Sequence, residues 1–166
     1  EVINFVAEHK NAFERIEPSF FEMTVALAFD CFAKHEVDIA VVEVGLGGVL
    51  DSTNVISPLL SIITNIGWDH MNMLGNTLPK IASQKAGIIK PNTPVIIGEY
   101  QPEVADVFTV KAQEKNAKIS FASEDWEISD IEKSSELLRC KVACKYLTQQ
   151  LQPTTYNVSL DLTGSY

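Results

Sequence analysis

Short apolar segments alternate with helical patterns along most of the chain. Nearly continuous runs of apolar residues occupy 37–44, 59–66, 94–98 and 118–121. Apolar residues at helical spacing occupy 1–15, 19–34, 77–87 and 102–117. Strands covered on both faces read as unbroken apolar runs, and their alternation with helices indicates parallel strands. The pattern therefore predicts an α/β fold with a mostly parallel, doubly wound sheet.

The second predicted helix has a specific start signal. Ser19, followed three positions later by Glu22, is a capping box, in which each residue bonds the other's backbone N–H. The helix should run to about Lys34. Its wide apolar face, which includes Phe21 and Phe32, is expected to be buried.

The pattern becomes less regular after Ser123. Residues 126–128 are consistent with a short strand, 134–151 with a polar helix and 154–162 with an alternating strand. We therefore expect a less regular C-terminal segment after the sheet.

The composition fits one globular domain over residues 1–166. The chain is 46% hydrophobic with a formal net charge of −9, which argues against nucleic acid and anionic membranes because those surfaces attract clustered Lys and Arg. Three cysteines without a CxxC pair indicate reduced thiols, and no apolar run approaches the length of a membrane span. We expect a cytoplasmic monomer. Because the chain begins with Glu1 rather than Met, we expect it to be part of a longer protein.

A glycine loop follows the first apolar run. Gly45, Gly47 and Gly48 suggest a dinucleotide-binding fingerprint, but that fingerprint needs a further glycine where Leu50 stands and an immediate helix, which Pro58 makes unfavourable. The simpler interpretation is a tight turn that needs positive φ at one or two glycines. A dinucleotide oxidoreductase is therefore a weak hypothesis, which a titration with NAD would test.

Three polar residues lie at or after the ends of the first two apolar runs. Glu43 ends the first run, and Asp69 and His70 follow the second. In an open α/β sheet the carboxyl ends of neighbouring strands meet at one crevice, so these side chains are expected to lie together there. A buried carboxylate costs on the order of several kcal/mol unless it is paired or bound to a cation. The alternative for His70 is a loop histidine bonded to backbone.

Lys85 is placed on the inward face of the predicted helix at 77–87. By helical spacing it continues the stripe formed by Leu78, Ile81 and Ala82. A lysine at that position either extends its amine to the edge of the core or becomes neutral, because burial disfavours the charged form. A neutral amine can act as a base, form a Schiff base or accept carbon dioxide.

Several of these segments together resemble one known family. The segments are GLGG at 45–48, LDSTN at 50–54, GWDH at 67–70 and KAGIIKP at 85–91. In this order and spacing they closely resemble the folylpolyglutamate synthase and dihydrofolate synthase family, part of the Mur ligase superfamily. The likeness is strongest over 18–98 and continues more weakly to Tyr166.

The resemblance implies a fold and a reaction. It implies the central domain of a Mur ligase. In that family ATP phosphorylates a folate or dihydropteroate carboxylate, and the amine of L-glutamate attacks the acyl phosphate. Two Mg²⁺ ions neutralise the phosphates and the developing charge.

The same resemblance implies roles for individual residues. Glu43 and His70 are similar to metal ligands of the family, and Lys85 is similar to its carbamylated lysine, whose carbamate oxygen suits Mg²⁺. His70 and Lys85 are thus the catalytic candidates. The resemblance also implies contacts to folate or dihydropteroate, and the ring of Phe20 or Phe21 would stack on the pterin. The implied contact residues are Ser19, Phe20, Phe21, Glu22, Leu50, Asp51 and Ser52.

Two departures from the family pattern bear on activity. Val49 stands where the family usually has arginine in GLGGRLD. The family's phosphate loop, of the GTNGKGS type, lies upstream of the matching region, and its C-terminal glutamate-binding domain lies downstream. We therefore expect the chain on its own to be inactive and its parent protein to be the ligase. The alternatives are a non-catalytic binding module of the same fold and a Mur ligase of cell-wall synthesis.

Overall fold

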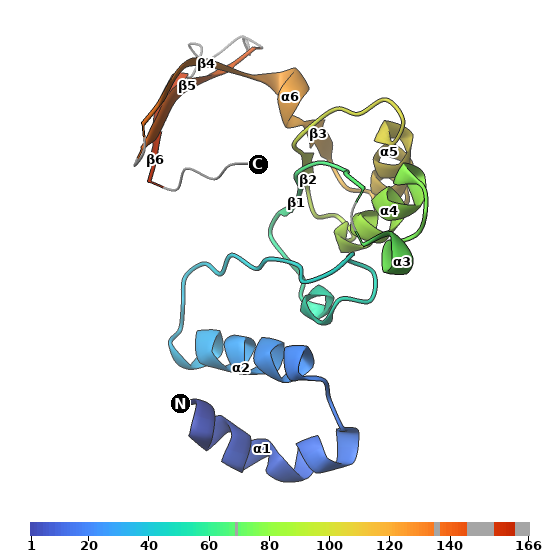
Figure 1. Cartoon of the computed structure of the whole chain (residues 1–166), viewed down its shortest axis with the longest axis vertical. Coiled ribbons are helices and arrows are strands. Elements are labelled where there is room, and N and C mark those ends of the chain that lie inside the picture. The colour runs from blue at the N-terminus through green and yellow to red at the C-terminus, as the bar shows by residue number, and fades with distance from the viewer. Residues whose placement is uncertain (69, 135–136, 146–154, 162–166) are drawn as a thin grey trace. The chain divides into compact units, whose positions relative to one another are not determined.

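A computed structural model of the chain describes residues 1–68, 70–134, 137–145 and 155–161. The chain forms two compact units, Glu1–Ser57 and Pro58–Tyr166 (Figure 1). Within the described ranges, no helix combines the length and apolar character that crossing a bilayer requires.

The first unit contains two long helices and one short one. They are α1 (Val2–Ile16), α2 (Phe20–Lys34) and the 3₁₀ helix η1 (Ser52–Val55). Phe5 of α1 is the buried anchor of this unit, and the His9 ring packs edge-on against it with centroids 4.6 Å apart. The predicted capping box is confirmed: Ser19 Oγ accepts the Glu22 N–H at 3.2 Å, and Glu22 Oε2 accepts the Ser19 N–H at 2.7 Å.

The expectation that α2 buries a wide apolar face is wrong. Every residue of α2 is described, and none is fully buried. Phe21 is 42% exposed, while Phe32 is half-buried. The apolar periodicity identified the helix correctly, but burial also requires elements on both sides of a face this wide.

The predicted strand at 37–44 is also wrong. The strands among the described residues pair with one another and not with this segment. Ile39 and Val41 are consequently 79% and 94% exposed. A strand forms only where a neighbour takes up its backbone N–H and C=O groups, and an apolar run alone does not supply that neighbour.

The second unit contains the predicted parallel sheet. Its strands are β1 (Ser61–Ile63), β2 (Val95–Ile97) and β3 (Ile119–Phe121), in that spatial order. In their register, Ile63 lies opposite Ile97, which lies opposite Phe121. Ile63 and Ile97 are buried, as expected of strands covered by helices. The predicted α/β class is confirmed.

Helices connect these strands. The first connection carries α3 (Met71–Leu74), α4 (Leu78–Lys85) and the 3₁₀ helix η2 (Ala86–Ile88), and the second carries α5 (Ala105–Glu114). Both steps advance in the same direction along the sheet, so right-handed crossovers place α4 and α5 on the same face. The two helices contact each other and lie beside the sheet (Figure 1). Ile81 of α4 and Phe108 of α5 are almost completely buried.

The C-terminal segment is more regular than predicted. After the short helix α6 (Ala122–Asp125), strands β4 (Trp126–Lys133), β5 (Leu138–Cys144) and β6 (Thr155–Leu160) form an antiparallel sheet. The polar helix expected at 134–151 is wrong where it is described, because β5 occupies its middle. The two-residue alternation of Leu138, Cys140 and Val142 with Arg139 and Lys141 is the signature of a strand. Residues 135–136 and 146–151 of the expected helix lie outside the described residues.

Candidate active site

Asp51 holds the glycine loop in shape. Its Oδ2 accepts the Leu46 N–H at 2.8 Å, and its Oδ1 accepts the Thr53 N–H at 2.9 Å and the Thr53 hydroxyl at 2.5 Å. The loop turns through Gly47, which is buried with φ 73°, so only glycine fits there without strain. The expected tight turn is confirmed, and the carboxylate of Asp51 fastens both of its ends.

These hydrogen bonds determine the charge state of Asp51. Partial burial acts to raise the pKa of Asp51, but the hydrogen bonds from Thr53 and from the backbone of Leu46 and Gly45 outweigh it. The pKa of Asp51 is therefore lower than usual. Asp51 is a fixed anion at neutral pH, and its two oxygens are already engaged within the loop.

The start of α2 contacts the glycine loop. A methyl group added at Gly45 would collide with the ring of Phe21, so the aromatic side chain packs directly on the loop backbone. The neighbouring Phe20 is 82% exposed, and Leu50 on the loop is 93% exposed. Two of the predicted substrate contacts thus present open apolar surface, while Phe21 is partly committed to packing.

Glu43 does not lie at the end of a buried strand. Its side chain is exposed, in the segment that leads into the glycine loop. The predicted desolvation of this carboxylate is therefore wrong, because it depended on a strand at 37–44. Water solvates an exposed carboxylate well, so it needs no cation to offset burial.

His70 begins the short helix α3. Its backbone is left-handed, with φ 46° and ψ 39°, and its carbonyl accepts the N–H groups of Met73 and Leu74 at 2.8 and 2.9 Å. The His70 side chain is exposed. Asp69, the predicted companion, lies outside the described residues.

The backbone before His70 is held by a side chain that the sequence did not single out. Gln101 Oε1 accepts the Ile66 N–H at 2.7 Å, and Gln101 Nε2 donates to the Ile66 carbonyl at 2.9 Å. Ile66 is buried, so the amide satisfies two backbone groups that water does not reach. A glutamine after a strand carries no pattern that predicts this role, and neither does Thr53 in the glycine loop.

Lys85 is the last residue of α4. The predicted stripe is largely confirmed: Ile81 and Ala82 are fully buried, while Leu78 and Lys85 are half-buried. Thr77 caps α4, with its Oγ1 accepting the Lys80 N–H at 3.4 Å. Half-burial of Lys85 fits both alternatives stated for it, so the position of its amine stays a prediction.

The three predicted metal ligands belong to different units. Glu43 lies in the first unit, whereas His70 and Lys85 lie in the second, on elements α3 and α4 that contact each other. Their convergence on one ion stays a prediction. The donor set fits Mg²⁺ in part: Glu43 supplies the oxygen that Mg²⁺ prefers, and Lys85 can supply one only as a carbamate.

Comparison with known proteins identifies the family to which this architecture belongs. The family model described as Mur ligase middle domain matches residues 7–166. The chain is 47% identical over 116 residues to the dihydrofolate synthase/folylpolyglutamate synthase of Bacillus subtilis. The matched region covers 68% of the chain and 27% of that protein. The chain is also 42% identical over 140 residues to the protein of the same name from Mycobacterium tuberculosis. That matched region covers 81% of the chain and 27% of the relative.

Solved structures agree with this likeness. The folylpolyglutamate synthase of Thermotoga maritima superposes with a TM-score of 0.81 at 30% identity over 98% of the chain and 37% of that structure. A folylpolyglutamate synthase in complex with AMPPCP and folate gives 0.79 at 35% identity over 86% of the chain and 37% of that structure. The chain thus spans between about a quarter and two fifths of these relatives' length. The chain belongs to the Mur ligase middle-domain family.

Proposed function

We propose that the chain is part of an ATP-dependent ligase that joins a carboxylate of dihydropteroate or folate to the amine of L-glutamate. The observation that carries this proposal is the likeness to a folylpolyglutamate synthase solved with AMPPCP and folate. The carboxylate attacks the γ-phosphorus of ATP and ADP departs. The glutamate amine then attacks the acyl carbon, phosphate departs and the amine loses a proton. The new bond is an amide.

The first unit would bind the pterin part of the substrate. The exposed ring of Phe20 and the exposed side chain of Leu50 provide apolar surface on which a flat heterocycle can stack. Ser19 and Glu22 engage each other in the capping box, and Asp51 is engaged by the loop, so these three would act chiefly by shaping the surface. Ser52, half-buried at the start of η1, would add a polar contact.

Glu43, His70 and Lys85 would together hold the Mg²⁺ that accompanies ATP. Glu43 contributes a carboxylate oxygen and His70 an imidazole nitrogen. The Lys85 amine, once neutral, would add to carbon dioxide and release a proton, which gives a carbamate with the oxygen ligand that Mg²⁺ prefers. When bound, the ion neutralises phosphate charge that increases during phosphoryl transfer.

Ligation by the complete protein that contains this chain tests the proposal. Glutamate incorporation into dihydropteroate and into folate would be measured across Mg²⁺ concentrations for the wild type and Lys85→Ala. We expect Lys85→Ala to lower turnover at least about tenfold and to raise the Mg²⁺ concentration required, since loss of groups that organise a metal typically costs 10- to 100-fold.

The matched control is Lys80→Ala. Lys80 lies on the same helix, its side chain is exposed, and its Nζ bonds only the side chain of Asn76 among the contacts described, at 3.3 Å. Wild-type turnover in Lys80→Ala together with a Mg²⁺-dependent defect in Lys85→Ala supports the assignment. Identical Mg²⁺ dependence in Lys85→Ala and the wild type would refute the role of Lys85, and absence of glutamate incorporation by the wild type would refute the ligase.

A further inference from the structure

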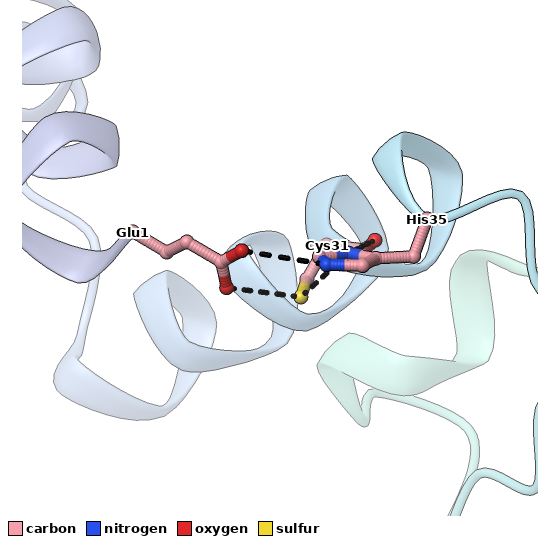
Figure 2. Close-up of side chains that lie close together, drawn as sticks. All are labelled: Glu1, Cys31 and His35. Carbon is pink, nitrogen blue, oxygen red and sulfur yellow. Dashed lines mark hydrogen bonds and ion pairs between the residues drawn. The ribbon is translucent and has the colours of Figure 1, made fainter.

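A cluster of three ligand-type side chains lies in the first unit and includes no residue that the proposed ligase uses. Glu1 caps α1, and Cys31 and His35 lie one turn apart at the end of α2 (Figure 2). Within the described part of the chain, these are the three His, Cys or acidic residues found to place one ligand atom each within 4.8 Å of the others. They line a hollow of about 220 Å³ between the two helices, together with Asn4, Asp30 and Lys34.

Two separations within the cluster are close to those around a tetrahedral ion. Cys31 Sγ lies 3.6 Å from Glu1 Oε2, and His35 Nε2 lies 3.4 Å from Glu1 Oε1. Zinc bonds of about 2.3 Å to sulfur and about 2.0 Å to nitrogen or oxygen place tetrahedral ligands roughly 3.3–3.6 Å apart. The side chains of Glu1 and His35 are 69% and 56% exposed, so both can rotate to bring their ligand atoms onto one ion.

The tautomer of His35 leaves one nitrogen available. His35 Nδ1 lies 2.9 Å from the backbone carbonyl of Cys31, which can only accept a hydrogen bond. Nδ1 therefore carries the proton in the neutral ring, and the lone pair is on Nε2, the nitrogen that faces Glu1. Metal-binding histidines are commonly oriented in this way by a bond from the other ring nitrogen to a carbonyl.

Two carboxylates, those of Glu1 and Asp30, lie near the Cys31 thiol. Burial raises the pKa of the Cys31 thiol, and the carboxylates of Glu1 and Asp30 raise it further. Lys34 is the nearby cation, and its ammonium group is paired with Asp30 at 2.7 Å. The acidic groups that disfavour a bare thiolate are the groups that favour a dication beside it.

We propose that Glu1, Cys31 and His35 form a binding site for a dication of the zinc class, which joins the start of α1 to the end of α2. Thiolate and imidazole select zinc, cobalt and similar ions, whereas Mg²⁺ takes oxygen ligands, so this site is separate from the one proposed for the ligase reaction. Binding replaces the thiol proton: the S–H bond breaks, the S–metal bond forms and one proton is released. The fourth ligand is water or the side chain of Asn4, which lines the same hollow.

Titration of the complete, reduced protein with Co²⁺ tests the site. A thiolate ligand gives a cobalt charge-transfer band in the near ultraviolet, and four-coordinate cobalt gives intense visible bands. We expect both at one equivalent of Co²⁺, with displacement by Zn²⁺ and none by excess Mg²⁺. Cys31→Ser should abolish the charge-transfer band, and His35→Gln and Glu1→Gln should each weaken Co²⁺ binding at least about tenfold.

Two variants serve as matched controls. Cys140→Ser removes a thiol from β5 in the other unit, and His9→Gln removes another histidine from the first unit. Both should bind Co²⁺ as the wild type does, and circular dichroism would establish that all variants keep their helices. Absence of the charge-transfer band in the wild type, its persistence in Cys31→Ser, or unchanged affinity in His35→Gln would overturn the proposal. None of these results bears on the ligase proposal, which uses other residues.

Discussion

Replacement of Asp51 by Asn should loosen the glycine loop while leaving its shape nearly unchanged. The two side chains have the same size, but Asn keeps one acceptor oxygen and presents an NH₂ group in place of the other. Either Leu46 N–H or the Thr53 donors then face a donor instead of an acceptor. Loss of one hydrogen bond to a charged group costs about 1.5–3 kcal/mol.

Hydrogen exchange of individual amides measures this loss where it occurs. We expect the amides of Leu46 and Thr53 to exchange about 10- to 100-fold faster in Asp51→Asn, since about 1.4 kcal/mol corresponds to a factor of ten. Ser52→Ala is the control, because Ser52 lies beside Asp51 on η1 and contributes no side-chain hydrogen bond to these amides. Equal exchange rates in Asp51→Asn and the wild type would show that the carboxylate does not hold the loop.

The same loop should depend on pH in a defined direction. The pKa of Asp51 is lower in the folded chain, despite burial, because of its hydrogen bonds, so the unfolded chain binds the proton more tightly. The stabilisation is therefore fully present above the unfolded value of about 3.9 and is lost as the pH falls through the folded pKa. Protection of the Leu46 amide should decrease over that acidic range in the wild type and not in Asp51→Asn.

Three further substitutions test the scaffold. Ile81→Ala should lower the free energy of unfolding of the second unit by about 2–5 kcal/mol, because Ile81 is completely buried, and urea denaturation would measure it. Gln101→Leu should speed amide exchange at Ile66 by leaving its buried N–H unbonded, at a cost of about 1–3 kcal/mol; unchanged exchange would contradict the bond. Ser19→Ala should destabilise α2 by about 0.5–2 kcal/mol, seen as faster exchange in its first turn, whereas Ser19→Asp should retain protection.

The sequence predicted the elements whose signals are local. The capping box at Ser19 corresponds to the observed start of α2, and the apolar runs around Ile63 and Ile97 correspond to β1 and β2. Each depends on interactions among residues close in sequence, or on burial between a sheet and its connecting helices. Glycine at position 47 was likewise predictable, because a tight turn with positive φ admits little else.

The predictions that failed needed a partner that the local pattern does not specify. The run 37–44 has strand composition, yet its exposed Val41 shows that composition cannot supply a pairing neighbour. The prediction that Glu43 is buried fails for the same reason. At 134–151 the two-residue alternation around Val142 predicts a strand better than the polar character predicts a helix. The role of Gln101 could not be predicted, because a side chain that hydrogen-bonds a backbone group distant in sequence leaves no sequence pattern.

The convergence of Glu43, His70 and Lys85 on one ion is the central claim, and substitution of Mn²⁺ for Mg²⁺ tests it most directly. In the complete protein with a non-hydrolysable ATP analogue, pulsed electron paramagnetic resonance of bound Mn²⁺ detects a ligating nitrogen through its hyperfine coupling. We expect a histidine nitrogen coupling that disappears in His70→Ala, together with weaker Mn²⁺ binding in Glu43→Gln and Lys85→Ala. Bound Mn²⁺ without nitrogen coupling in the wild type, or with coupling that survives in His70→Ala, would contradict it.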